Sequence, residues 1–268
     1  MSPGKSFLLP RPVPGARARL FCFPYAGGSA SLFREWCDCL SPEIEIVAVQ
    51  LPGRGTRYPE PLLRDTCDLV RDIHAEIPCW LGKPYGLFGH SMGAIIAYEL
   101  AHLLQNDRHL RPFRLFVSGK RAVHLPRSAG LLNHQLPDPE FLQLLKEYGR
   151  HDAGIYENPE LIELMMPIWR ADFELAETYR FRSREPLNCP VTAYGGTTDK
   201  WVSEQDLLHW QALTAGEFSH RMFDGGHLFI HSQQKSLLES IRRFILADLA
   251  AAPPMTVAPF GDSAACCR

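Results

Sequence analysis

The chain has 268 residues, of which 46% are hydrophobic, and a formal net charge of −2 at pH 7. This near-neutral charge argues against a protein whose main task is to bind nucleic acid, because such proteins carry a basic excess. The hydrophobic content excludes wholesale disorder, since ample apolar surface is available to offset the chain entropy lost on folding. The length lies at the upper end of what one core supports and predicts one large domain.

The sequence shows no sign of a membrane segment or a metal site. The N-terminal apolar stretch is too short for a signal peptide, and no window reaches the roughly 18 apolar residues that span a bilayer. The eight cysteines lack the paired spacing that is typical of zinc sites. We therefore expect a cytoplasmic protein with reduced thiols, no metal and no membrane partner.

Segments typical of strands alternate with segments typical of helices. In chain order we predict a strand at 19–24, a helix at 32–40, a strand at 43–51, a helix at 62–77, a strand at 85–88, a helix at 91–105, strands at 113–117, 190–194 and 219–223, and a helix at 237–249. Strands separated by helices require crossover connections, which favour a parallel sheet. The pattern predicts an α/β fold with a mostly parallel central sheet flanked by helices.

One segment interrupts the alternation. Between the strands that end near Ser118 and begin near Cys189, the pattern is helical only. Pro167 is expected to kink or split the second of its helices. We interpret the segment as a helical cap inserted into the sheet domain. The predicted organisation is an N-terminal extension at 1–18, a domain at 19–250 with the cap at about 120–187, and a flexible tail at 251–268.

The strongest local signal is Gly89-His90-Ser91-Met92-Gly93, which lies between a predicted strand and a predicted helix. It matches the G-x-S-x-G pattern in the context that this motif requires. The glycines permit a sharp turn that holds the serine in a strained conformation and projects its hydroxyl group. The start of the helix presents free N–H groups to developing negative charge. We therefore predict that Ser91 is a nucleophile.

A serine hydroxyl is a weak nucleophile and needs a base with an orienting carboxylate. In folds with this motif, the aspartate and then the histidine follow the serine along the chain. Asp199 follows a predicted strand directly, where such sheets place function. Asp206 and Asp224 are less favoured alternatives, because the first lies on a predicted helix surface and the second precedes a Gly-Gly turn. His227 follows that turn and is the predicted base.

Acyl transfer also needs two N–H donors for the tetrahedral oxyanion. One is expected at Met92, and the other in the loop 23–30 after the first strand. That loop is rich in the small residues that a close backbone approach requires. A phosphate cradle is the alternative use of such a loop, but the sequence contains neither a G-x-G-x-x-G nor a Walker pattern.

Several segments together resemble one known family. They are residues 20–29, 50–54, 88–94, 115–119, 170–173, 195–199 and 225–227, or LFCFPYAGGS, QLPGR, FGHSMGA, LFVSG, RADF, GGTTD and GGH. In this order they resemble the type II thioesterases, which are stand-alone α/β hydrolases that serve polyketide and nonribosomal peptide synthases. The resemblance covers about residues 19–248. One departure is Tyr25, where many members have histidine.

The resemblance implies an α/β-hydrolase fold in which Ser91, Asp199 and His227 form a catalytic triad. It also implies an oxyanion hole made by the backbone N–H groups of Ala26 and Met92. The substrate would be an acyl thioester on the phosphopantetheine arm of a carrier domain, and the reaction would remove aberrant or stalled acyl groups. We expect a monomer that binds acyl- or peptidyl-carrier domains and small acyl substrates and uses no cofactor.

The cap is expected to form a channel for the arm and a chamber for the acyl group. Flexible methionine surfaces suit varied acyl shapes. The candidate substrate-binding residues are Tyr25, Met165, Met166, Ile168, Trp169 and Phe173. For any one of the cap residues, packing of the cap onto the core is the alternative.

Two other functions fit the same motifs. A carboxylesterase or a medium-chain fatty-acyl thioesterase, acting on small-molecule or CoA esters, uses the same triad, so the serine motif does not separate these enzymes. A non-catalytic binding protein of the hydrolase fold typically lacks a triad residue, whereas all three candidates are present here. On the basis of the family resemblance, we predict a thioesterase that acts on carrier domains.

Overall fold

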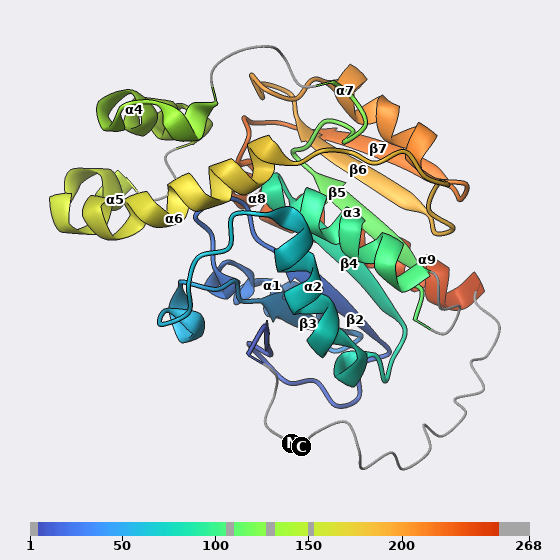
Figure 1. Ribbon diagram of the computed structural model, residues 1–268. Coiled ribbons are helices and arrows are strands. Elements are labelled where there is room, and N and C mark those ends of the chain that lie inside the picture. The colour runs from blue at the N-terminus through green and yellow to red at the C-terminus, as the bar shows by residue number, and fades with distance from the viewer. Residues whose placement is uncertain (1–4, 106–109, 127–131, 150–152, 252–268) are drawn as a thin grey trace.

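A single mixed sheet organises the molecule. The computed structural model describes residues 5–105, 110–126, 132–149 and 153–251, and within them the sheet has seven strands in the order β1-β3-β2-β4-β5-β6-β7 (Figure 1). The strands are β1 (Phe7–Leu8), β2 (Ala18–Phe23), β3 (Ile44–Val49), β4 (Tyr85–His90), β5 (Arg114–Ser118), β6 (Val191–Gly196) and β7 (Phe218–Phe223). All neighbouring strands are parallel except β1 and β3. The predicted mostly parallel sheet is confirmed.

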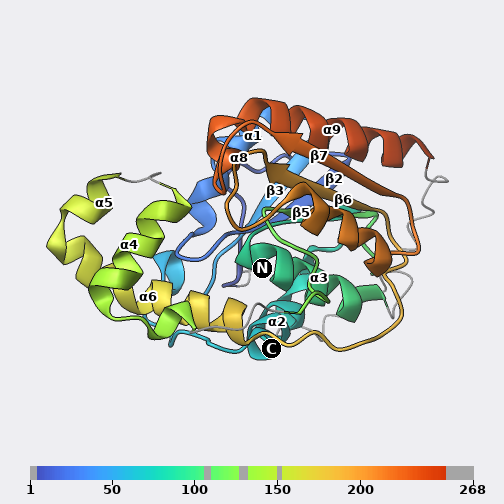
Figure 2. The same cartoon turned by 90° about the horizontal axis from the view of Figure 1, so that it is seen from above.

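Helices cover both faces of this sheet. The α-helices of the described residues are α1 (Trp36–Leu40), α2 (Thr66–Glu76), α3 (Met92–Gln105), α4 (Asp138–Tyr148), α5 (Ala153–Glu157), α6 (Pro159–Thr178), α7 (Glu204–Leu208), α8 (Phe229–Ser232) and α9 (Gln234–Ala251). Short 3₁₀ turns are η1 (Ala30–Phe33), η2 (Gly55–Arg57), η3 (Ile77–Trp80), η4 (Asn133–Gln135) and η5 (His209–Leu213). Seen from above, α2 and α3 lie on one side of the sheet and α1, α8 and α9 on the other (Figure 2).

Alternating side chains of the central strands build a core on each face. Phe21 of β2 and Leu87 of β4 pack into the core on the side of α2 and α3. Their neighbours Leu20 and Phe88 pack into the core on the side of α1 and α9. Because both faces are covered, β4 is buried along its whole length, and β2 is buried at every position except Arg19. This burial holds the carboxyl ends of the strands in place, and the residues of the candidate active site follow those ends.

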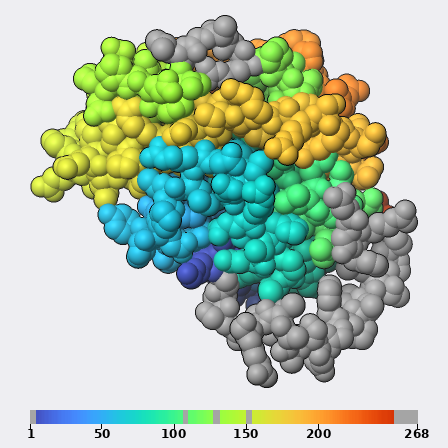
Figure 3. Space-filling model, viewed as in Figure 1, coloured from blue at the N-terminus to red at the C-terminus, as the bar shows by residue number. Residues whose placement is uncertain are grey.

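The cap segments lie between β5 and β6 in the chain. Helices α4, α5 and α6 project from one end of the sheet (Figures 1 and 2) and have a small core of their own around Phe141, Leu145 and Trp169. Helix α6 and the residues before α2 lie side by side on one face of the molecule (Figure 3), where Arg64 Nη1 is 2.5 Å from Glu174 Oε2. The limits proposed for the domain and its cap stay predictions.

The predicted split of this helix at Pro167 is wrong, and a kink at this residue stays a prediction. Helix α6 runs unbroken through this residue from Pro159 to Thr178. Pro167 and Glu163, one turn earlier, are both exposed, so the carbonyl group that loses its helical partner lies on the outer side, where water can bind it. The next two residues, Ile168 and Trp169, are buried and hold the second half of the helix in place.

Other differences concern short elements and the chain ends. The predicted helix at 32–40 is divided into η1 and α1, and the predicted N-terminal extension contains β1. A strand of two residues shows no alternation that a sequence pattern could reveal. The predicted tail lies outside the described residues except for Ala251, which ends α9. Among the described helices, none combines the length and apolarity needed to cross a bilayer.

Replacement of Phe7 with alanine is expected to lower the free energy of unfolding by about 3–5 kcal/mol, the usual cost of removing a buried phenylalanine ring. Phe7 is fully buried, and its ring centroid lies 5.5 Å from those of Phe21 and Trp80. Denaturant unfolding measures the change. Lys5→Ala is the control, because the Lys5 side chain is 76% exposed. Equal effects of the two variants would contradict a structural role for β1.

Candidate active site

The turn between β4 and α3 holds Ser91 in a strained conformation. β4 ends at His90 and α3 begins at Met92, so Ser91 alone makes the turn. Its φ of 54° is the only positive φ of a non-glycine residue in the described part of the chain. The Ser91 N–H donates to the carbonyl oxygen of Ser118, at the end of β5, over 2.7 Å. The neighbouring strand therefore holds the turn in place.

Two glycines let this turn form. A Cβ on Gly89 would lie 2.1 Å from the carbonyl oxygen of Gly93, and a Cβ on Gly93 would lie 2.3 Å from the carbonyl oxygen of Phe23. Both gaps are too small for any side chain, so both positions require glycine. The first helical turn of α3 thus packs directly against the ends of β2 and β4, and its N-terminus lies beside the serine.

Three side chains from distant parts of the chain meet at the carboxyl ends of the strands. Ser91 follows β4, Asp199 follows β6 and His227 follows β7. His227 Nε2 lies 2.9 Å from Ser91 Oγ, and His227 Nδ1 lies 2.8 Å from Asp199 Oδ2. The Asp199 carboxylate is fully buried and the His227 imidazole is 5% exposed. The structure thus brings together the three residues that the sequence singles out.

Backbone groups fix the Asp199 carboxylate. Its Oδ1 accepts the N–H groups of Trp201 and Val202 at 2.9 and 3.3 Å, which leaves Oδ2 facing His227. The two alternatives lie elsewhere. Asp206 forms a capping box at the start of α7, and Asp224 accepts a hydrogen bond from the Thr197 hydroxyl group.

Aromatic rings cover the His227 imidazole. The Tyr148 ring, from α4 of the cap, lies 5.0 Å from the His227 ring and stacks on Trp201 at 3.8 Å. Burial, with smaller contributions from the charges of Glu177 and Asp199, raises the pKa of Tyr148, so its phenol stays neutral. No sequence motif points to Tyr148 or Trp201. Together they limit the access of water to the imidazole.

His90 packs behind the site. It is fully buried, its Nδ1 lies 2.9 Å from Ser118 Oγ, and its ring lies 5.3 Å from that of His227. Burial lowers the pKa of His90 well below its usual value, and the neighbouring His227 and His231 lower it further. His90 is therefore uncharged and adds no positive charge beside the hydrogen-bonded relay of Ser91, His227 and Asp199.

Two backbone N–H groups beside Ser91 have no hydrogen-bond acceptor among the described residues. Ala26 and Met92 both line the cleft that Ser91 opens into. Within the described residues neither N–H group donates a hydrogen bond, although Met92 is buried. Met92 is also the first residue of α3, where the partial positive charge of the helix end is concentrated. The pair is suited to bind an anionic oxygen.

The cleft has a volume of about 750 Å³ and runs from Ser91 and His227 to the cap. This is in the usual range for small-molecule sites. Of the predicted substrate-binding residues, Tyr25, Met165, Ile168, Trp169 and Phe173 line it. Met166 is not among the lining residues; successive residues of a helix point in different directions, and Met166 packs against the cap core, as Met165 does. In the described residues, no group of three or more potential ligands is arranged to hold a metal ion.

Lys120 lines the same cleft without an ion-pair partner in the part of the chain that the structure describes. It follows β5, and no motif marks it in the sequence. Burial, assisted by the charge of Arg121 and opposed by that of Glu177, lowers the pKa of Lys120 to about 8. The cleft therefore contains one amine that is less basic than a surface lysine.

The fold and this relay define the chain as an α/β hydrolase, because a strained serine between strand and helix is followed in order by aspartate and histidine. The family model of the thioesterase domain matches residues 18–245. The chain therefore belongs to the thioesterase family, and the prediction of a thioesterase is confirmed.

Individual relatives agree with this assignment. Gramicidin S biosynthesis protein GrsT of Aneurinibacillus migulanus is 38% identical over 224 residues, which are 84% of this chain and 87% of that protein. The solved structure of the type II thioesterase BorB, from the borrelidin biosynthetic cluster, is 31% identical with a TM-score of 0.82 and covers 93% of this chain and 99% of that one. The medium-chain S-acyl fatty acid synthase thioesterase of Homo sapiens is more distant, at 30% identity over 81% of this chain and 82% of that protein. The predicted resemblance to type II thioesterases is confirmed.

Replacement of Lys120 with methionine is expected to stabilise the protein at neutral pH. The pKa of Lys120 is about 8 in the folded chain against an ordinary value of 10.5, so the unfolded chain binds this proton more tightly. Burying the charged amine therefore lowers the free energy of unfolding. This destabilisation has its full size below about pH 8 and disappears as the pH rises through about 10.5. The stability gained by Lys120→Met should therefore shrink between pH 7 and pH 10.

Thermal unfolding of both proteins across this range measures that difference. Lys200→Met is the matched control for the loss of one amine, because the Lys200 side chain is 70% exposed. A stability difference for Lys120→Met that is independent of pH would contradict a lowered pKa.

Proposed function

We propose that this chain is a serine thioesterase that hydrolyses acyl thioesters on the phosphopantetheine arm of carrier domains. In this role it removes aberrant or stalled acyl groups during polyketide or nonribosomal peptide synthesis. The observation that carries the proposal is the relay of Ser91, His227 and Asp199 at the base of a cleft of about 750 Å³ under a helical cap. Membership of the thioesterase family and a relative named for gramicidin S biosynthesis support it.

In the first half of the proposed reaction, Ser91 Oγ attacks the carbonyl carbon of the thioester while His227 Nε2 takes its proton. Asp199 accepts the hydrogen bond of His227 Nδ1 and stabilises the imidazolium that forms. The electron pair of the carbonyl bond moves to its oxygen, which lies between the N–H groups of Ala26 and Met92. The C–S bond then breaks, and the thiolate leaves with the proton of His227 as the free pantetheine thiol.

In the second half, water replaces the thiol. His227 takes a proton from the water while the oxygen attacks the acyl-serine carbonyl carbon, and a second oxyanion forms at the same N–H groups. The C–O bond to Ser91 breaks, the acid leaves, and the proton of His227 returns to Ser91 Oγ. No metal or cofactor takes part in this reaction.

The surroundings of the relay fit this chemistry. The cleft wall formed by Met165, Ile168, Trp169 and Phe173 offers an apolar surface to an acyl chain. All three relay residues come from one chain, so a monomer is sufficient. The proposal places this monomer in the cytoplasm with its carrier-domain partners.

A carboxylesterase or an enzyme for free fatty-acyl-CoA would need the same relay. The two substrate classes differ in the carrier domain, which only the proposed substrate has. Turnover of the same acyl group on a purified carrier protein and on CoA, at equal concentration, distinguishes them. Faster turnover on the carrier supports the proposal, and equal or faster turnover on CoA favours the alternative.

Ser91→Ala is expected to lower the turnover of acetyl-carrier protein by on the order of a million-fold, because the relay acts as a unit. Intact-mass spectrometry of the carrier follows the loss of the acyl group. The matched control is Ser31→Ala, since Ser31 lines the same cleft without contacting the relay. Undiminished turnover by the folded Ser91→Ala protein would refute the proposed function.

Asp199→Asn is expected to lower kcat by roughly 10⁴-fold, because an amide favours the wrong tautomer of the imidazole. Asp206→Asn is the matched control: it removes a carboxylate from the same segment that caps α7 and does not reach His227. Steady-state kinetics of both variants on the same acyl-carrier protein provide the comparison. Equal losses of kcat in the two variants would show that Asp199 has no special part in the reaction.

A further inference from the structure

Two of the segments that resemble the family contain charged residues with no part in the relay. Arg54 lies in the loop after β3, and Asp172 lies in α6 of the cap. Arg54 Nη1 and Nη2 donate to Asp172 Oδ2 and Oδ1 over 2.5 and 2.7 Å. Their side chains are 7% and 2% exposed. Desolvation offsets most of the attraction in such a buried pair, so a gain in stability does not explain its presence.

Both members of this pair also bind the loop that carries Ala26. Asp172 Oδ2 accepts the N–H of Gly27 over 2.6 Å, and Arg54 Nη1 donates to the carbonyl oxygen of Gly28 over 3.3 Å. Gly27 follows Ala26 directly, and peptide units are rigid planes. The Ala26 N–H lies in the same peptide plane as the Tyr25 carbonyl group, and this carbonyl accepts the Gly28 N–H over 2.9 Å. The contacts that hold Gly27 and Gly28 therefore orient the Ala26 N–H through this hydrogen bond.

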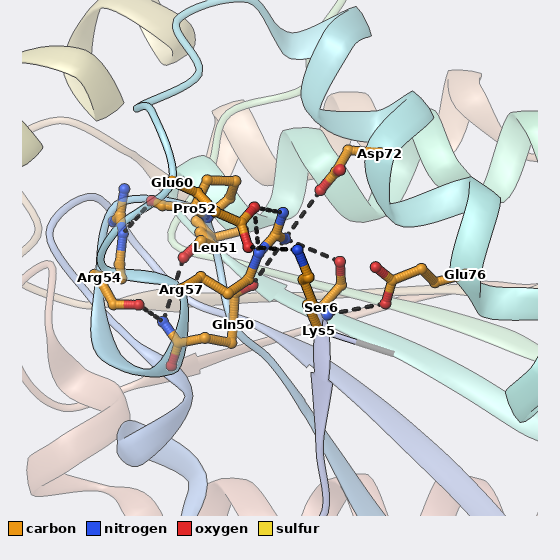
Figure 4. Close-up of polar contacts among 10 residues, drawn as sticks. All are labelled: Lys5, Ser6, Gln50, Leu51, Pro52, Arg54, Arg57, Glu60, Asp72 and Glu76. Carbon is orange, nitrogen blue, oxygen red and sulfur yellow. Dashed lines mark hydrogen bonds and ion pairs between the residues drawn. The ribbon is translucent and has the colours of Figure 1, made fainter. Parts of the chain in front are cut away.

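The local backbone directs Arg54 towards this loop. Arg54 itself is extended, with φ −151° and ψ 158°, between Gly53 and Gly55, which have φ of 76° and 53°. Only glycine adopts these left-handed values without strain. The Gln50 side chain closes the turn, because its Nε2 donates to the Arg54 carbonyl oxygen over 3.0 Å (Figure 4).

A second buried arginine braces the same turn. Arg57 is 3% exposed and donates to Ser6 Oγ over 2.9 Å and to the Gln50 carbonyl oxygen over 3.3 Å. It also pairs with Asp72 of α2 over 2.9 Å and with Glu60 over 2.6 Å (Figure 4). The turn that presents Arg54 is thus anchored to α2 and to the edge of the sheet, so Arg54 has a fixed base.

We propose that Arg54 and Asp172 act as a clamp that positions the Ala26 N–H for the oxyanion. They are positioning residues, because they act through Gly27 and Gly28. The clamp also makes the oxyanion hole depend on α6, which carries Asp172 together with the cleft residues Trp169 and Phe173. This inference rests on the proposed function of Ser91.

Asp172→Asn keeps the size of the side chain but removes its charge and one of its two acceptor oxygens. We expect kcat to fall by about 100-fold, the usual loss when one oxyanion donor is removed, with KM nearly unchanged. Affinity for an acyl trifluoromethyl ketone, whose adduct with Ser91 contains an oxyanion, should fall by the same factor as kcat/KM. Affinity for a non-hydrolysable acyl-pantetheine ether and the pH profile of kcat should not change. Equal loss of affinity for both ligands would overturn the clamp.

The double variant Arg54→Met/Asp172→Leu separates positioning from stability. Apolar replacements of similar volume often restore the stability of a broken buried ion pair, but they leave Gly27 without its acceptor and Gly28 without its donor. We expect the Tm to recover towards that of the natural chain while kcat stays about 100-fold low. Recovery of kcat together with Tm would overturn the proposal, because the pair would then be only structural.

Asp248→Asn is the matched control for a buried arginine pair away from the cleft. Asp248, on α9, receives two hydrogen bonds from Arg114 over 2.7 and 2.8 Å. This variant should lower the Tm without lowering kcat, and a loss of kcat as large as that of Asp172→Asn would overturn the clamp. If Asp172→Asn keeps its full kcat while turnover still requires Ser91, the clamp is also overturned. Turnover that does not require Ser91 would instead refute the proposed function.

Discussion

The whole arrangement depends on the turn at Ser91, where the chain changes from a buried strand to a buried helix within one residue. The strained φ of 54° at Ser91 persists only because the surrounding structure prevents the backbone from relaxing to another conformation. The strands on both sides are buried, Ser118 binds the Ser91 N–H, and Gly89 and Gly93 remove the side chains that would force the helix away. The parallel order of the sheet then places the ends of β6 and β7 on the same edge, so the aspartate and the histidine reach the serine from separate loops.

Two buried carboxylates hold the parts of the site around this turn. Asp199 uses one oxygen for two backbone N–H groups and the other for His227. Asp172 uses Oδ2 for a backbone N–H of the loop after β2 and both oxygens for Arg54. In each case the hydrogen bonds offset the cost of burying the charge. Asp199 orients His227, the proposed base, and Asp172 holds the loop that carries Ala26, whose N–H is proposed to bind the oxyanion.

The sequence predicted the parts of the site that follow from local rules. The turn at Ser91 and the positions of Asp199 and His227 after strands could be recognised because parallel sheets gather such ends at one edge. The pairing of Arg54 with Asp172 joins residues 118 positions apart, and the contact of Tyr148 with His227 depends on how the cap packs, so no spacing rule reveals either. The unbroken course of α6 through Pro167 depends on which face of the helix is exposed. Met165 lines the cleft and Met166 does not, although both were predicted to bind substrate. The two side chains leave the same helix in different directions, and the sequence does not show which one faces the cleft.

Helix α6 therefore has two halves with different surroundings. From Ile168 to Leu175 its inner residues are buried, and Asp172 ties them to the loop that carries Ala26. Before Pro167, Leu161 and Leu164 are 39% and 46% exposed. A change of shape in the first half can alter the cleft without moving the N–H groups beside Ser91, whereas a shift of the second half changes both. In the proposed reaction, this division would let one cap accept different acyl groups while the geometry at the oxyanion stays constant.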